Sequence, residues 1–229
     1  MSIGDGVALH RYKYVALLVL ALTGLAVQSF DAQPGSEDLL SDLFQTALSV
    51  GILVVVFERH RARIAMGVIL IAIIAIGWVR HFLLTPDLNY ALSLSLYALM
   101  ALYFWTAVWV ILSDLFRTRG DGAKNVLGAI CGYLIAGEAW AAVNAFTYLL
   151  VPTAYGVSSD VDALLADWHG RLALFSYYSY AQMLSIGYAD VTPVRAPATT
   201  LSLFGALFGT FYTAVVVSQF VGMAQVKER

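Results

Sequence analysis

Long apolar segments limit what this chain can fold into. Six of them approach the length of about 20 residues that a helix needs to cross the hydrocarbon core of a bilayer. They cover residues 14–30, 39–57, 64–84, 88–113, 125–151 and 196–226. We therefore expect an all-α membrane protein with six transmembrane helices.

The composition agrees with this fold class. The chain is 60% hydrophobic and 12% charged, whereas soluble domains are about 45–50% apolar and about 25% charged. There is no basic tract of the kind that binds nucleic acid, and the four histidines show no metal-ligand spacing. Cys131 is the single cysteine, lies in an apolar segment and is interpreted as a packing residue. We expect a lipid environment, no cofactor and no nucleic-acid or soluble partner.

The first apolar segment allows two interpretations. Residues 14–30 follow Arg11 and Lys13, as the core of a signal peptide would. The apolar run is long for a signal peptide, and the sequence around Asp31 is a poor cleavage site. We favour a retained helix, and either choice leaves the following segment starting on the outer side.

The distribution of positive charge predicts the orientation, because cytoplasmic loops carry an excess of lysine and arginine. With the N-terminus inside, ten of the thirteen basic residues fall on cytoplasmic segments. They are Arg11, Lys13, Arg59, Arg61, Arg63, Arg117, Arg119, Lys124, Lys227 and Arg229. Arg80, Arg171 and Arg195 fall outside. We expect a multi-pass plasma-membrane protein with both termini in the cytoplasm.

A short, polar and aromatic stretch, residues 175–190, lies between the last two apolar segments. It begins as a short helix, predicted over 170–183, and then breaks into a loop. The loop residues are Ser185, Ile186, Gly187, Tyr188, Ala189 and Asp190. Irregular backbone at membrane depth is tolerated only inside protein or beside an aqueous path. Glycine permits the unusual dihedral angles that turn successive carbonyls the same way, so the loop is predicted to line an ion path.

This loop resembles the selectivity filter of the potassium-channel family, which reads Thr-Val-Gly-Tyr-Gly-Asp and conducts through backbone carbonyls. Five of the six positions are matched or conservatively replaced, and the exception is Ala189, where the family has glycine. The resemblance covers roughly residues 124–229 and runs without gaps from Tyr177 into the last apolar segment. The first half of the chain carries no comparable match.

The resemblance implies a homotetramer that conducts permeant monovalent cations, foremost potassium, along the four-fold axis. It implies potassium sites at Ser185, Ile186, Gly187 and Tyr188, with Tyr177 and Tyr178 as the paired aromatics that brace the filter. It also divides the chain into a four-helix domain, 1–123, and a pore domain, 124–229. The pore domain would hold an outer helix 125–151, a pore helix 170–183, a filter 185–190 and an inner helix 196–226.

Two glycines four residues apart, Gly205 and Gly209, mark the predicted inner helix. Small residues at that spacing usually allow close helix packing. Gly209 also falls where the family has its hinge glycine, counted from Gly187, and both interpretations stay open. Thr210, Thr213 and Val217 would then face the cavity below the filter.

The front half lacks the pattern of a voltage sensor. Such a sensor needs several arginines at three-residue spacing in one span, and residues 88–113 contain none. Arg59, Arg61 and Arg63 are two residues apart in a turn and are interpreted as a topology signal. We expect neither a conventional voltage sensor nor a cytoplasmic ligand-binding domain. His169, just before the predicted pore helix, would sense external pH or, as we favour, is a solvated loop residue.

Glu138 is the only acidic residue deep in a predicted span. Ionisable groups at this depth mark functional sites by default. The alternative that we favour is a protonated or hydrogen-bonded acid that faces tyrosine or serine groups of the pore helix.

Enzymes and transporters find little support. Glu138 and His81 are predicted at opposite depths of different helices, so they form no catalytic pair, and no inverted repeat of interrupted helices is visible. We expect a passive potassium-channel-like protein and no enzyme. The alternatives are a weakly selective cation channel and a non-conducting membrane scaffold that kept the channel fold.

Overall fold

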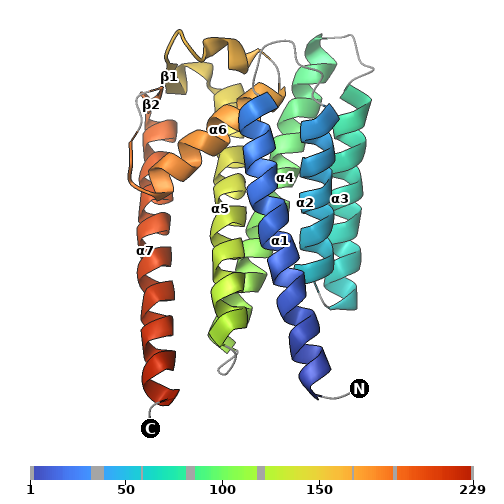
Figure 1. Ribbon diagram of the computed structural model, residues 1–229. Helices are drawn as coiled ribbons and strands as arrows, with labels where there is room; N and C mark the ends of the chain where they lie inside the picture. The colour runs from blue at the N-terminus through green and yellow to red at the C-terminus, as the bar shows by residue number, and fades with distance from the viewer. Residues whose placement is uncertain are drawn as a thin grey trace.

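The computed structural model describes residues 3–31, 39–57, 59–80, 86–117, 122–166, 168–187 and 190–227. Most of these residues lie in long helices that run side by side with alternating direction (Figure 1). The long helices are α1 (Ile3–Asp31), α2 (Leu39–Val56), α3 (His60–Arg80), α4 (Pro86–Arg117), α5 (Gly122–Leu150) and α7 (Ala196–Lys227). A shorter helix, α6 (Trp168–Met183), is inclined to the bundle and crosses from α1 toward α7 (Figure 1).

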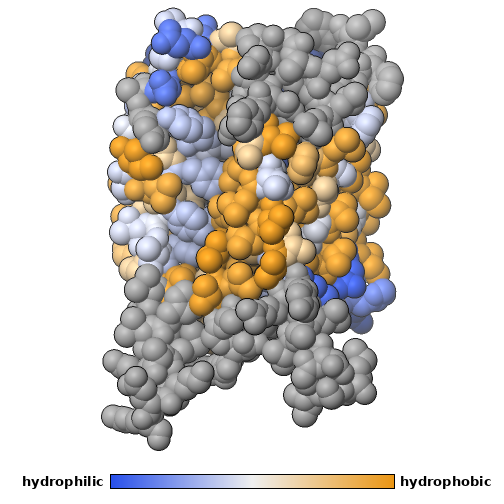
Figure 2. All heavy atoms as spheres, in the orientation of Figure 1, coloured by the Kyte–Doolittle hydropathy of each residue, from blue (hydrophilic) through white to orange (hydrophobic). Residues whose placement is uncertain are grey.

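Among the described residues, four helices are long and apolar enough to cross a membrane, over His60–Val79, Leu88–Phe116, Asn125–Leu150 and Ala196–Val216. The apolar stretches of α1 and α2 are shorter, at Lys13–Gln28 and Leu43–Val56. On the face in view, apolar residues cover most of the middle beside a strip of mildly hydrophilic residues on the left, and the most hydrophilic residues lie near the two ends (Figure 2). The protein is therefore a mostly helical integral membrane protein.

Helix α5 forms the centre of the fold. It contacts α1, α4, α6 and α7, and 67% of its apolar window is buried, against 17% for α7 and 11% for α3. Small residues allow this close packing, and the buried ones include Ala129, Ala136, Ala139, Ala142 and Ala145.

Two tyrosines attach α6 and α7 to α5 by the same geometry. Tyr180 of α6 donates a hydrogen bond to the carbonyl oxygen of Leu134 at 2.6 Å, and Tyr212 of α7 donates to that of Ala129 at 2.6 Å. A glycine lies three residues after each carbonyl. A Cβ at Gly137 would collide with the ring of Tyr180, and one at Gly132 would lie 2.6 Å from the hydroxyl of Tyr212. Each glycine thus leaves room for the tyrosine ring that covers it.

The segment between α5 and α6 is ordered by a small sheet. After the short helix η1 (Pro152–Ala154), strand β1 (Tyr155–Val157) pairs antiparallel with β2 (Val191–Pro193), which follows the predicted filter. A second short helix, η2 (Asp162–Leu165), precedes α6. Neither strand was predicted from the sequence. The sheet fixes the outer end of the predicted filter segment to the end of α5.

A buried chain of hydrogen bonds supports this sheet. The Tyr155 hydroxyl donates to Asn144 Oδ1 at 2.8 Å, and Asn144 Nδ2 donates to Ser179 Oγ at 3.0 Å. The Tyr155 ring packs edge-on against Phe175 and Tyr178 of α6. Burial raises the pKa of the Tyr155 phenol, so its hydroxyl keeps the proton that it donates. These contacts join strand β1, α5 and α6 at one end of the bundle.

Candidate functional site

Helix α6 enters the bundle only part of the way. Its 16 residues extend about 24 Å at about 1.5 Å per residue, less than the about 30 Å of a hydrocarbon core. Its last residue, Met183, packs against Gly209 near the middle of α7, where a Cβ would lie 2.6 Å from Met183 Cα. The chain then returns to the outer end, where β2 pairs with β1. Together, α6 and residues 184–187 form a re-entrant element, which enters the bundle beside α5 and α7 and does not cross it.

The backbone at the end of α6 is left-handed at two residues. The Ile186 N–H donates to the carbonyl of Ala181 at 2.8 Å, and the Ser185 N–H donates to that of Gln182 at 2.9 Å. These two bonds, with φ of 56° at Ser185, form a Schellman motif, in which that position is usually glycine. Gly187 follows with φ of 71°.

Both left-handed residues, Ser185 and Gly187, belong to the predicted filter. A left-handed conformation costs a non-glycine residue roughly 1–2 kcal/mol, and such strain is found mainly at functional sites. At Ala189, where the family has glycine, the resemblance left two outcomes open: a filter held under strain or one that relaxes at its outer end. Ala189 and Tyr188 lie outside the described residues, and the described strain is at Ser185.

The two predicted filter-bracing tyrosines lie in different surroundings. Tyr178 is buried, and its hydroxyl lies 2.6 Å from Ser202 Oγ of α7. It braces α6 against α7 within one chain. Tyr177 is 43% exposed. Asp190, at the end of the predicted filter, is partly buried, and its carbonyl accepts a hydrogen bond from the Ser158 N–H at 2.9 Å.

The glycines of α7 lie at its contact with α6. Gly209 faces the backbone of Met183, and a Cβ at Gly205 would lie 3.3 Å from Gln182 Oε1. This contact supports the packing interpretation, and the hinge stays a prediction. Thr210 and Thr213 are exposed and donate to α7 carbonyls at 2.9 Å. The Val217 side chain lies outside the described part of the chain.

Glu138 is buried, with 4% of its surface exposed. Ser176 Oγ donates to its Oε2 at 3.2 Å, and the Tyr180 hydroxyl lies 3.3 Å from its Oε1. The predicted hydrogen-bonded arrangement of Glu138 toward serine and tyrosine groups is thus confirmed, with both partners on α6. Tyr180 was not singled out from the sequence, although it and Ser176 are four residues apart and therefore share one face of a helix.

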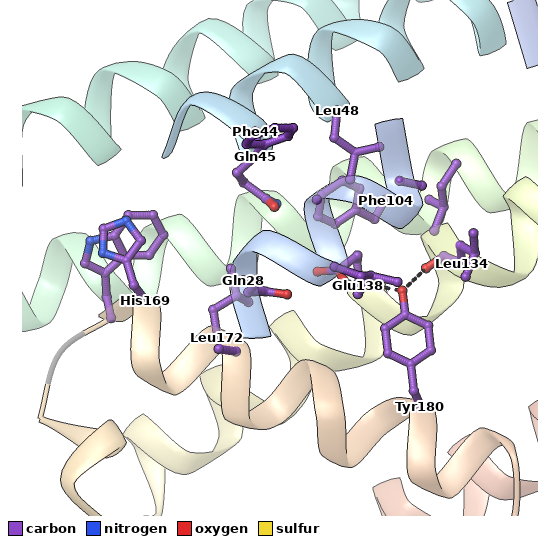
Figure 3. Close-up of a pocket in the computed structure, with 16 residues that line it drawn as sticks. Gln28, Phe44, Gln45, Leu48, Phe104, Leu134, Glu138, His169, Leu172 and Tyr180 are labelled. Carbon is purple, nitrogen blue, oxygen red and sulfur yellow. Dashed lines mark hydrogen bonds between the residues drawn. The ribbon is translucent and has the colours of Figure 1, made fainter. Parts of the chain in front are cut away.

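A narrow internal cavity adjoins Glu138 between α6 and the helices α1, α2, α4 and α5 (Figure 3). Gln28, Gln45 and His169 contribute polar groups to its lining, together with Glu138 and Tyr180. His169 lies in the first turn of α6, partly buried beside Trp168, with ring centroids 3.7 Å apart. The interpretation of His169 as a solvated loop residue is therefore wrong, because α6 begins at Trp168 and turns it inward.

Within the described ranges, no group of three or more His, Cys, Asp or Glu residues could hold a metal ion. Comparison with known proteins gives no match to a family model, a curated protein or a solved structure.

Proposed function

We propose that this protein is a passive cation channel of the potassium-channel type, with six membrane spans, that assembles as a homotetramer in the plasma membrane. Potassium is the favoured ion and binds to carbonyls of Ser185, Ile186, Gly187 and Tyr188. The observation that carries the proposal is the re-entrant element formed by α6 and its return segment between α5 and α7.

Exposed, non-helical backbone at the level of the middle of α7 supports a role for this element at an aqueous path. Leu184 is 57% exposed and Ile186 50% exposed in the single chain, and both belong to non-helical backbone near the middle of α7. Such backbone is stable in a bilayer only beside protein or water. Identical copies arranged in a ring cover it and enclose a path on their axis. The carboxyl end of α6, where a helix carries about half a negative charge, then favours a cation beneath the filter.

Liposomes that contain the purified protein test this function through potassium and sodium flux. Gly187→Ala is expected to abolish flux, because alanine is strained at φ of 71° although nothing within 4 Å obstructs a Cβ. The matched control is Gly77→Ala on α3, which also meets nothing within 4 Å. Absence of flux from an intact tetramer contradicts the proposal and leaves a non-conducting scaffold.

A weakly selective cation channel is the second candidate, and Ala189 favours it. If alanine prevents the outer carbonyls from reaching the axis, an ion site is lost and sodium is discriminated less well. Ala189→Gly is then expected to raise potassium selectivity or the open lifetime in paired recordings under equal gradients. A glycine variant that matches the parent in both quantities contradicts this account of the substitution.

A further inference from the structure

The cavity behind α6 contains a carboxyl group without a visible counter-charge. No described residue that lines it is lysine or arginine. Besides Glu138, the titratable groups that line the cavity are His169 and Tyr180 of α6, and Tyr133 of α5 lies near Tyr180. The lining residues of α1, α2 and α4 are apolar, glycine or glutamine. A buried carboxylate in such surroundings is costly and is usually neutralised.

The hydrogen-bond geometry around Tyr180 indicates how neutralisation occurs. A tyrosine hydroxyl has one proton to donate. The Leu134 carbonyl, at 2.6 Å, is within the ordinary O–H···O range, whereas Glu138 Oε1 lies farther away at 3.3 Å. The proton of Tyr180 therefore points to Leu134. The contact between the Tyr180 hydroxyl oxygen and Glu138 Oε1 then has no proton from Tyr180. It joins two accepting oxygens unless Glu138 Oε1 itself carries a proton.

We propose that Glu138 is a proton-binding site whose neutral carboxyl group attaches the pore helix to α5. Glu138 donates from Oε1 to the Tyr180 hydroxyl, Tyr180 donates to the Leu134 carbonyl, and Ser176 donates to Oε2. Each donor then has one acceptor. Loss of the proton would leave a buried anion and remove the donor that orients Tyr180.

The cavity beside Glu138 also reaches α2, in the front half of the chain. Gln45 of α2 lines the cavity, and its Nε2 is buried without a partner among the described residues. The side chains of Gln45 and Gln28 point into the space beside Glu138 (Figure 3). The cavity volume of about 30 Å³ is enough for about one water molecule. A water donating and accepting here would connect α2 to the Glu138–Tyr180 pair, and so the front helices to the pore helix.

Infrared difference spectroscopy of the full-length protein tests the proton directly. We expect the carbonyl band of a protonated carboxylic acid at neutral pH, shifted by exchange into D₂O and absent from Glu138→Gln. Tyr180→Phe should shift the band, because its acceptor is lost, whereas Tyr90→Phe, whose hydroxyl bonds Leu149 at the end of α5, should not. If Glu138→Gln does not fold, disappearance of the wild-type band on alkaline titration remains the readout. Absence of the band at neutral pH overturns the proposal.

Regulation of flux by this proton rests on the proposed channel function and is measured separately. In liposomes, wild-type flux should fall as pH rises and the proton leaves Glu138, whereas Glu138→Gln flux should stay constant. Equal pH dependence of both proteins overturns the regulatory role. A protein that shows the infrared band and conducts no ions contradicts the channel and retains the proton site.

Discussion

Glycines on α5 determine which aromatic rings can approach it. Gly137 lies beneath the ring of Tyr180, and Gly132 lies beneath the hydroxyl of Tyr212. In both cases the tyrosine hydroxyl also donates a hydrogen bond to the carbonyl of the α5 residue three positions before the glycine. The residue at each position is therefore fixed by the space that its neighbour requires, although neither glycine has a positive φ.

Gly137→Ala is expected to displace Tyr180 and to destabilise the fold by about 1–3 kcal/mol, as overpacking of a core does. Thermal unfolding in mild detergent measures the effect. Gly77→Ala on α3 is the control, because nothing lies within 4 Å of its added Cβ. Equal melting temperatures of the two variants would show that Tyr180 moves aside without cost.

Ser185 offers a second test at the scale of a single residue. Ser185→Gly should relieve the left-handed strain and stabilise the fold by up to about 1 kcal/mol. The gain in stability is smaller than the strain because glycine has greater freedom in the unfolded chain. Ser185→Ala removes the hydroxyl and keeps the strain. A glycine variant no more stable than the alanine variant in denaturant titration would show that φ of 56° is unstrained here.

At the scale of elements, the outer sheet and α6 depend on one buried chain of polar groups, Tyr155–Asn144–Ser179. Tyr155→Phe leaves Asn144 Oδ1 without its donor and should cost about 1–3 kcal/mol, the cost of an unsatisfied buried acceptor. Amide hydrogen exchange is expected to accelerate in β1, β2 and the carboxyl-terminal half of α6, which holds Ser179. Acceleration confined to β1 would mean that the sheet and α6 are stabilised independently. Thr192→Val, which removes a longer 3.3 Å bond to the Gly156 carbonyl at the exposed strand edge, is the comparison variant.

The sequence predicted the helices of the pore half well. The pore helix predicted at 170–183 spans Trp168–Met183, and the inner helix predicted at 196–226 spans Ala196–Lys227. Apolar length and aromatic clustering are strong signals for such elements. In the front half, α3 begins at His60 instead of 64 and α4 continues to Arg117 instead of 113, because polar residues extend a helix beyond its apolar part.

Other features had no sequence signal. Strands of three residues show no usable alternation, so β1 and β2 were not predicted. The strained residue was sought at Ala189 by resemblance, whereas the Schellman bonds that turn Ser185 depend on where α6 ends. The contacts of Glu138 with Ser176 and Tyr180 agree with the hydrogen-bonded acid that was favoured, and a functional role for Glu138 stays a prediction. The division into domains, the ion sites and the tetramer stay predictions.

At the scale of the whole molecule, the single chain leaves its re-entrant element uncovered on one side. Tyr177, Leu184 and Ile186 are exposed, and the latter two border non-helical backbone whose polar groups need protein or water around them. A ring of identical chains satisfies this requirement through one repeated interface. Exposed apolar residues elsewhere, such as Ile71 on α3, need only lipid.

We therefore expect assembly to depend on the surface that carries Tyr177, Leu184 and Ile186, and not on the exposed surface of α3. Native mass spectrometry from mild detergent should show a tetramer. Ile186→Ala should lower the temperature at which that tetramer dissociates, because a side chain that is half exposed in the single chain becomes covered in the ring and loses its contacts. Ile71→Ala, which removes the same atoms from a side chain that is 68% exposed, should leave the dissociation temperature unchanged. A stable monomer or dimer, or equal effects of the two substitutions, would contradict an axis lined by residues 185–188 and with it the channel.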